Sequence, residues 1–380
     1  MRNSEFSSSL DIAAHRPGGR SVVVAMSGGV DSSVAAALLV EEGFQVIGVG
    51  LQVWDYSVSN ASSKRFGTCC APADFADARR VAEALGIPFY LLDAETVFRE
   101  AVVEPFVASY AEGRTPNPCV SCNQRVKFDY LMNRALGFGA DIVATGHYAS
   151  LVRDNRSGRL AVARGVDLDK DQSYYLFDLS QKQLARVTFP LAELTKDKVR
   201  QKAKQLRLMV AEKPESQEVC FIPDGATASF LARELGNDAV GEGEVVDDEG
   251  AVIGRHSGYA YYTVGQRRGL GVAAGVPLYV SRIDPAANRL EVGPDEVLWR
   301  RSLSVGSLTW AIPPALGEQV GLDVQIRSRH QAAPAAVEPL PNGRARVTFE
   351  EPQRAIAPGQ AAVFYAEGVV VGGGWIEAEG

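Results

Sequence analysis

No uninterrupted apolar run in the sequence is long enough to cross a bilayer, and the opening segment MRNSEFSSSLDIAAHRPGGR has no apolar core like that of a signal peptide. Cysteine is scarce: five residues in 380, an odd number, do not suit a secreted disulfide framework. Positive charge is not in excess, and the formal net charge of −7 argues against a protein that coats nucleic acid without specificity. These absences predict a cytoplasmic protein whose residues 1–20 form a disordered polar leader.

The composition is that of a globular protein, with 46% hydrophobic and 22% charged residues, and 380 residues are expected to fold as two or three domains. In the first half, short apolar runs alternate with amphipathic stretches of helix length. This alternation predicts an α/β fold with a doubly wound parallel sheet. The predicted strands are 21–26, 45–53, 88–93 and 141–146, and the clearest predicted helices are 31–42, 73–86 and 195–208.

The pattern changes near residue 215, where short alternating runs bounded by turn residues begin. These runs lie at 243–254, 277–293, 320–330, 344–352 and 361–373. We therefore predict an α/β domain over 21–222, a small β-rich middle domain over 223–292 and a C-terminal β-barrel-like domain over 293–380.

The most informative segment lies between the first predicted strand and the first predicted helix. Its two glycines let the backbone turn tightly and present N–H groups, and the start of the helix adds partial positive charge. The hydroxyls of Ser27 and Ser32 can donate to phosphate oxygens, and a carboxylate such as Asp31 beside phosphates implies Mg²⁺. The loop lacks the lysine of the Walker motif, and a Gly-rich turn with no ligand is the alternative. The segment comprises Ala25, Met26, Ser27, Gly28, Gly29, Val30, Asp31 and Ser32.

The pattern Ser-Gly-Gly-x-Asp-Ser after a first strand resembles the loop of the PP-loop ATP pyrophosphatases. The resemblance implies an enzyme that cleaves ATP to AMP and pyrophosphate and uses the AMP to activate an oxygen. The loop alone does not choose among the members, which include NAD, GMP, asparagine and argininosuccinate synthetases and several tRNA-modifying enzymes.

The positions of three cysteines narrow the choice among these enzymes. Cys119 and Cys122 stand in the Pro-rich stretch Thr-Pro-Asn-Pro-Cys-Val-Ser-Cys-Asn, which leads into a predicted helix, and Cys220 follows 98 residues after the second of them. A helix start favours the reactive thiolate form of a nearby cysteine. A zinc half-site is the alternative for the first two, although no second pair follows at zinc spacing, and a buried small hydrophobe is the alternative for the third.

Together with the loop, these cysteines make the chain resemble the bacterial tRNA-specific 2-thiouridylases from about Val22 to the C-terminus. The resemblance implies ATP-dependent exchange of oxygen for sulfur at C2 of the wobble uridine of tRNA, with release of AMP and pyrophosphate. It also implies Lys, Glu and Gln acceptor tRNAs and a sulfur donor such as a cysteine desulfurase or a relay protein. Further matching blocks are 144–148, 170–174, 218–223, 263–271, 358–360 and 362–365.

By the same resemblance, individual residues acquire expected roles. Leu51 and Gly146 would join the loop in holding ATP, and Cys122 and Cys220 would be the catalytic pair. The residues expected to meet the target base are Asn117, Pro118 and Cys119. The residues expected to contact tRNA are His147, Lys170, Asp171, Gln172, Arg327, Ser328 and Gln360.

Cys119 departs from the better-known members, which have an Asp at this position. In one interpretation, a persulfide on Cys220 attacks the activated uridine and Cys122 resolves it as a disulfide, so that Cys119 takes no part. In the other, Cys119, Cys122 and Cys220 hold an iron–sulfur cluster with one iron open to sulfide. The spacing of the thiols and the softness of iron favour the cluster.

Other features support less specific predictions. The vicinal pair at 69–70 is predicted to pack locally, with a sulfur relay as the alternative. The basic residues between 196 and 207 could follow phosphates or form a solvated helix face. Arg267-Arg268 and Arg327-x-Arg329 are better candidates for tRNA contact, because basic clusters matter more in an acidic protein.

Rival functions stay open. A cytidine-lysidine ligase or a 4-thiouridine synthase would share the loop, but neither explains the cysteine block together with the β-rich domains. A tRNA-binding or sulfur-carrier protein with a decayed loop would not need intact Ser27, Gly28, Gly29 and Asp31.

Overall fold

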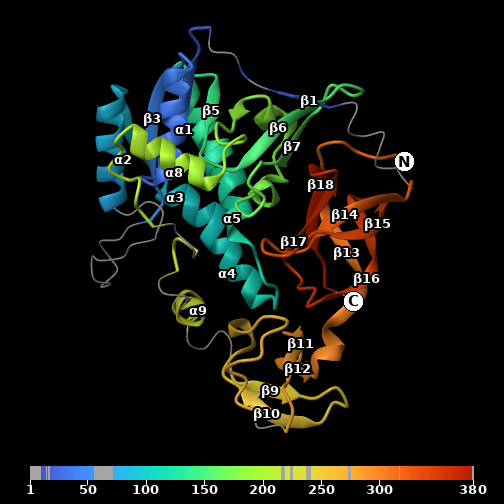
Figure 1. Ribbon diagram of the computed structural model, residues 1–380. Helices are drawn as coiled ribbons and strands as arrows, with labels where there is room; N and C mark the ends of the chain where they lie inside the picture. The colour runs from blue at the N-terminus through green and yellow to red at the C-terminus, as the bar shows by residue number, and fades with distance from the viewer. Residues whose placement is uncertain are drawn as a thin grey trace.

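The computed structural model describes residues 10–13, 15, 18–54, 72–214, 219–222, 226–236, 241–272, 275–315 and 317–378. Cys69 and Cys70 therefore lie outside the described residues. Figure 1 shows an α/β part in blue to green, a small β-rich part in yellow to light orange, and a second β-rich part in orange to red. This order of elements confirms the predicted fold class.

The α/β part is built on a parallel sheet with the strand order β4-β3-β2-β5-β8. The central strand β2 (Ser21–Ala25) is apolar and its interior is buried, as expected where helices cover both faces of a sheet. Val22 pairs with Val46 of one neighbouring strand and with Ile142 of the other. The remaining strands are β3 (Gln45–Gln52), β4 (Phe89–Asp93), β5 (Ile142–Ala144) and β8 (Val187–Thr188).

Helices cover the two faces of this sheet. Val22 and Val24 point into one apolar core with α1 (Val30–Glu41), α2 (Pro72–Leu85) and α8 (Lys196–Gln205), whereas Val23 points into the other. None of the helices in the described ranges is long and apolar enough to cross a membrane. The second face is covered mainly by α3 (Glu95–Phe98), the π-helical η3 (Arg99–Val103), α4 (Glu104–Ala111), α5 (Pro118–Ser121), the π-helical η4 (Cys122–Tyr130) and α6 (Leu131–Gly137).

An antiparallel hairpin that the sequence analysis did not predict follows β5. It consists of β6 (Ala149–Asp154) and β7 (Leu160–Arg164), and β7 pairs at Ala163 with Val369 of the C-terminal sheet. The strand β1 (Leu10–Ile12) pairs along β6, because the open edge of the hairpin offers backbone partners. The prediction of a disordered leader was therefore wrong for these residues, and residues 1–9, 14 and 16–17 lie outside the described part. After the hairpin come η5 (Ser173–Leu176) and α7 (Gln181–Leu184).

The middle part contains a sheet with the order β10-β9-β12-β11 and a helix that the prediction of β-rich structure missed. This helix, α9 (Thr227–Leu235), packs Phe230 and Leu231 into the core of the α/β part against Phe106 and Phe221. Its short amphipathic pattern gains its stability from that packing and not from propensity. The other elements are β9 (Gly243–Val246), β10 (Val252–His256), η7 (Tyr259–Tyr261), β11 (Tyr279–Asp284), β12 (Arg289–Gly293) and η8 (Asp295–Leu298).

The C-terminal part is a closed antiparallel barrel, as predicted. Its strands pair in the order β13-β16-β15-β14-β17-β18, and β18 pairs back with β13. Along β16 buried and exposed residues alternate, which places one row of side chains in the barrel core. The strands are β13 (Trp299–Trp310), β14 (Val320–Gln325), β15 (Ala333–Leu340), β16 (Arg344–Arg354), β17 (Ala361–Ala366) and β18 (Val369–Ile376).

Candidate active site

The Gly-rich loop lies at the carboxyl end of β2, where the strand order of the sheet reverses. The chain leaves β2 for β3 on one side and returns to β5 on the other, and in open parallel sheets ligands bind at such switch points. The Ser27 backbone N–H and hydroxyl both lie within hydrogen-bond distance of the Ser32 hydroxyl, at 3.2 and 3.4 Å. The loop is thus closed on itself at the start of α1, with its polar groups at the helix N-terminus.

Two glycines are required by close backbone contacts around this loop. Gly28 has a φ of +72°, and a Cβ there would lie 2.0 Å from the carbonyl oxygen of Asp74 in α2. A Cβ on Gly146, just after β5, would lie 2.7 Å from the Ser32 nitrogen. The loop is therefore packed between α2 and the end of β5. Leu51, the other residue expected at ATP, is buried near the end of β3.

Asp31 is held by two side chains from distant parts of the chain. The Lys196 ammonium donates to both carboxylate oxygens at 2.8 Å, and the Tyr148 hydroxyl donates to Oδ1 at 2.7 Å. Lys196 is 8% exposed, at the first position of α8, where its backbone N–H also donates to Asp167. The loop sequence contains no lysine, and α8 supplies a cation to the loop through Lys196.

A second lysine, Lys213, contacts the backbone of the loop. The Lys213 ammonium donates to the Gly28 carbonyl oxygen at 3.0 Å and to carboxylates of Asp74 and Asp77 at 2.6 and 2.7 Å. Burial acts to lower the pKa of Lys213, but the hydrogen bonds that it donates to these carboxylates, together with their charges, outweigh burial and raise the pKa. Lys213 is thus a permanent cation that ties the loop to α2.

The segment Lys170–Gln172, expected at tRNA, is joined to the Asp31 cluster through Tyr148. The Gln172 side-chain oxygen accepts from the Tyr148 backbone N–H at 3.1 Å, and the Gln172 N–H donates back to the Tyr148 carbonyl at 2.9 Å. Asp171 forms an ion pair with Arg164 at 3.2 Å and accepts from Ser173. Burial raises the pKa of Asp171, opposed by the Ser173 bonds and by Arg164. Lys170 is half-buried beside them.

The cysteine loop enters a short helix, as predicted. The Asn117 side chain caps α5 by accepting from the Cys119 backbone N–H at 3.2 Å, and Pro118 occupies the first helical position. Cys119 is exposed, whereas Cys122 is half-buried and begins the π-helical turn η4. π-helical turns recur at functional sites, but no pattern in the sequence predicts a π-helical turn at Cys122.

Cys122 and Cys220 both pack against the large apolar core of the α/β part, which also contains Leu51. The next residue, Phe221, anchors the segment with its ring centroid 5.5 Å from that of Phe98. In the described part of the chain, no three Cys, His, Asp or Glu side chains gather closely enough to hold a metal ion. The thiols as arranged here do not fit an iron–sulfur cluster.

The barrel segment 327–329 meets the cysteine loop at Tyr175. Burial raises the pKa of the Tyr175 hydroxyl, a hydrogen bond with Ser328 and the charge of Arg329 lower it, and Cys119 raises it, so Tyr175 is influenced by groups from both segments. Arg327 donates to the Arg354 carbonyl at 3.0 Å, and its pKa is lowered by burial and by the Arg354 charge. The residues expected at the target base and part of those expected at tRNA are thus brought together.

Other residues expected at tRNA have different surroundings. His147 is 7% exposed, with its Nδ1 2.7 Å from the Thr145 hydroxyl, and burial lowers its pKa well below the ordinary value. Its contact with tRNA stays a prediction, as does that of Gln360, whose amide donates to backbone of the cysteine loop. Arg267 and Arg268 are exposed on a turn of the middle part.

The basic helix α8 does not form a uniform phosphate track. Lys196 is buried against Asp31, Lys202 is paired with Glu41, and Lys204 is paired with Glu212. Sequence reasoning could not single out Lys196, because its partner lies 165 residues earlier. It likewise could not assign Lys213, whose loop contact is 185 residues away.

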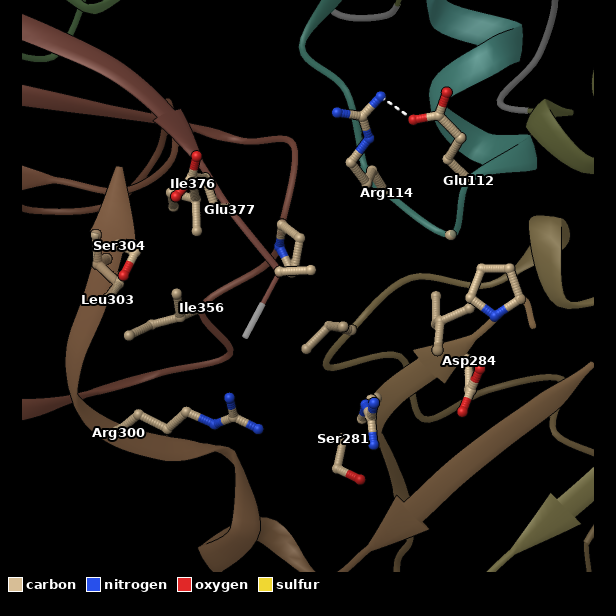
Figure 2. Close-up of a pocket in the computed structure, with 17 residues that line it drawn as sticks. Glu112, Arg114, Ser281, Asp284, Arg300, Leu303, Ser304, Ile356, Ile376 and Glu377 are labelled. Carbon is tan, nitrogen blue, oxygen red and sulfur yellow. Dashed lines mark hydrogen bonds and ion pairs between the residues drawn. The ribbon is translucent and has the colours of Figure 1, made fainter. Parts of the chain in front are cut away.

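A cavity of about 450 Å³ lies at the junction of the α/β part, the middle part and the barrel (Figure 2). Four of its charged side chains are paired: Arg114 with Glu112, Arg282 with Glu291, and Glu377 with Arg344. It adjoins the residues that precede the cysteine loop but does not include the ATP loop.

Comparison with known proteins follows the same division of the chain. The family described as "tRNA methyl transferase HUP domain" matches residues 20–224, a "PRC-barrel domain" of the same family matches 228–294, and an "Aminomethyltransferase beta-barrel domain" matches 300–376. A solved structure of NMN synthetase from Francisella tularensis covers 52% of this chain and 66% of its own at 20% identity, with a TM-score of 0.31, too low to add to the assignment.

Curated relatives match over nearly the whole chain. The tRNA-specific 2-thiouridylase MnmA of Geobacter metallireducens is 52% identical over 94% of this chain and 96% of its own. That of Geotalea uraniireducens is 50% identical over 94% of both chains, and that of Magnetococcus marinus is 48% identical over 93% of this chain and 98% of its own. With the loop, the cysteines and the three-part fold in the order described, the chain belongs to the tRNA-specific 2-thiouridylase family.

Proposed function

We propose that the chain is an ATP-dependent tRNA-uridine 2-sulfurtransferase, which adenylates O2 of the wobble uridine and replaces that oxygen with sulfur. The observation that supports this most strongly is that a Gly-rich loop, with Asp31 held by Lys196 and Tyr148, occurs in the same α/β part as the thiols of Cys122 and Cys220. One α/β part thus carries both a loop suited to the activation of an oxygen and a pair of thiols, and a two-step exchange requires both.

The family descriptions also contain the word methyltransferase, and the site argues against that chemistry for this chain. A phosphate-binding loop with an ionised carboxylate and two lysines suits ATP cleavage. Thiols at a helix start suit sulfur transfer. Methyl transfer would need neither.

In the first step, the uridine O2 attacks the α-phosphorus of ATP and pyrophosphate leaves. The loop N–H groups and the hydroxyls of Ser27 and Ser32 would hold the phosphates. Asp31 fits Mg²⁺, because this ion takes one or two carboxylates together with phosphate oxygens, and when bound it would neutralise charge developing on the phosphates. Lys196, now on Asp31, would then donate to a phosphate oxygen in the place of the missing Walker lysine.

In the second step, a persulfide on Cys220 attacks C2 through its terminal sulfur, and AMP leaves with the former O2. Cys122 then attacks the Cys220 sulfur, which releases 2-thiouridine and leaves a Cys122–Cys220 disulfide for an external thiol to reduce. Because the three thiols do not gather as cluster ligands, no step is assigned to an iron–sulfur cluster. Cys119 is exposed beside Tyr175 and would border the base.

The partners proposed are tRNA, with Lys, Glu and Gln acceptors, and a sulfur donor such as a cysteine desulfurase or a relay protein, acting in the cytoplasm. The groups around Tyr175 would receive the unstacked base, because an enzyme that acts on a base removes it from the stack. Arg267, Arg268, Arg327 and the 170–172 segment would contact the backbone of the RNA.

The test compares alanine variants of the cysteines, purified anaerobically and supplied with tRNA, ATP and a persulfide donor. Cys122→Ala and Cys220→Ala are expected to form no 2-thiouridine while still releasing pyrophosphate, and Cys119→Ala is expected to retain much activity. A Cys119→Ala enzyme that is inactive and has lost iron present in the wild type would contradict the persulfide route. A wild-type enzyme that forms no 2-thiouridine would contradict the function itself.

A further inference from the structure

A turn of the barrel, Pro358–Gln360, contacts the segment that leads into the cysteine loop. The Thr115 N–H donates to the Pro358 carbonyl at 2.8 Å. The Gln360 side-chain amide donates to the Thr115 carbonyl at 2.9 Å and lies 3.4 Å from that of Pro116. The backbone just before the capping residue Asn117 is therefore bonded from the barrel, 245 residues away.

The turn is itself fixed to β18. The Gly359 N–H donates to the Ile376 carbonyl, and the Ile376 N–H donates to the Gln360 carbonyl, both at 2.9 Å. Gly359 has a φ of +89°, and a Cβ there would lie 3.0 Å from the Thr115 nitrogen. Only glycine allows the backbones to approach this closely.

Hydrogen bonds join the two segments beside the junction cavity. Pro358 and Arg114 line the junction cavity, so one side of the contact faces open space (Figure 2). On the other side, Tyr174 joins the barrel through its hydroxyl, which donates to the Ala361 carbonyl at 3.0 Å and also interacts with Asn117. Loss of the Gln360 donor would leave Thr115 with one bond to the turn.

We infer that Gln360 is a positioning residue for the cysteine loop, which sets the place of Cys119 and Cys122 relative to the barrel before RNA arrives. This inference deepens the proposed function. A test of it by tRNA thiolation rests on that function, whereas a test by the reactivity of the Cys122 thiol does not. The barrel then has a role beyond RNA binding, because it also fixes the position of the two thiols. A side chain occupied in this way is not available as a simple RNA contact.

Gln360→Glu tests the inference, because a carboxylate of the same shape cannot donate to two carbonyls. The matched control is Gln353→Glu, the same change in the same barrel, where the amide donates to the Glu351 carbonyl of its own strand at 2.8 Å and has no hydrogen bond to the cysteine loop among the described residues. Alkylation of Cys122 by iodoacetamide is followed by peptide mass spectrometry without tRNA or ATP. Binding of tRNA and single-turnover thiolation are measured on the same preparations.

For Gln360→Glu we expect at least a threefold faster alkylation of Cys122, a tRNA Kd within twofold of the wild type and at least a tenfold slower thiolation. Gly359→Ala, which separates the same backbones without touching the amide, should accelerate alkylation in the same way. The control should match the wild type in all readouts. Unchanged alkylation in both Gln360→Glu and Gly359→Ala, or a loss confined to tRNA affinity, would overturn the inference. If the wild type forms no 2-thiouridine, the proposed function fails but the alkylation comparison still decides the inference.

Discussion

Replacing Lys196 by Met is the perturbation whose outcome the structure specifies most fully. The change keeps the length and apolar stem of the side chain but removes the ammonium that donates to both Asp31 oxygens at 2.8 Å. Asp31 then keeps the Tyr148 hydroxyl as a partner. Breaking a fully buried ion pair costs about 3–5 kcal/mol. Because the Asp31 side chain is 30% exposed, we expect about 2 kcal/mol here.

The catalytic effect should be larger than the effect on stability. If Lys196 donates to a phosphate oxygen in the transition state, its loss should lower kcat/KM for ATP by about 10²–10³, as for removal of one oxyanion donor. The assay is tRNA-dependent release of pyrophosphate over a range of ATP concentrations. The control is Lys204→Met on the same helix, where the side chain is 60% exposed and paired with the exposed Glu212. A Lys196→Met enzyme that behaves like this control would refute the role given to Lys196.

Further predictions follow from other parts of the site. Asp31→Asn should reduce pyrophosphate release at least about 100-fold while tRNA affinity stays unchanged, since the carboxylate serves the phosphates and not the RNA; undiminished release would remove Asp31 from the ATP site. Arg267→Ala should weaken tRNA binding and lower its salt slope by about one, as measured by filter binding at several salt concentrations; an unchanged slope would take this exposed turn out of the RNA surface. Burial lowers the pKa of His147, so below pH 6.5 the ring binds a proton more readily in the unfolded chain than in the folded one. The contribution of His147 to the free energy of unfolding is therefore fully present above pH 6.5 and falls below that value, by up to about 1.4 kcal/mol per pH unit. Denaturation of His147→Asn between pH 7.5 and 5.5 should show a shallower acid loss than the wild type, and equal slopes would contradict a buried neutral ring.

Local signals predicted the ATP loop and the helix start at the cysteines. β2, its glycines and α1 are adjacent in sequence, so their order alone indicates an anion site. In the same way, Asn-Pro-Cys contains its own capping residue and first-turn proline.

Contacts made by folding could not be predicted. Lys196 meets Asp31, and Gln360 meets Thr115, across 165 and 245 residues. Nothing in the local pattern of α8 distinguishes Lys196 from Lys204, because the difference between them is burial. The hairpin β6–β7 was missed for a related reason: its buried residues take their environment from β18 and the core and not from an alternating pattern.

The fate of the uridine oxygen tests the central claim most directly. Wobble uridine labelled with ¹⁸O at C2 is placed in tRNA and incubated with the enzyme, ATP and a persulfide donor, and the products are analysed by mass spectrometry. Adenylation at O2 predicts that each 2-thiouridine formed is matched by one AMP carrying a single ¹⁸O in its phosphate. Formation of 2-thiouridine with unlabelled AMP, or ¹⁸O retained in the tRNA while ATP is consumed, would contradict the account.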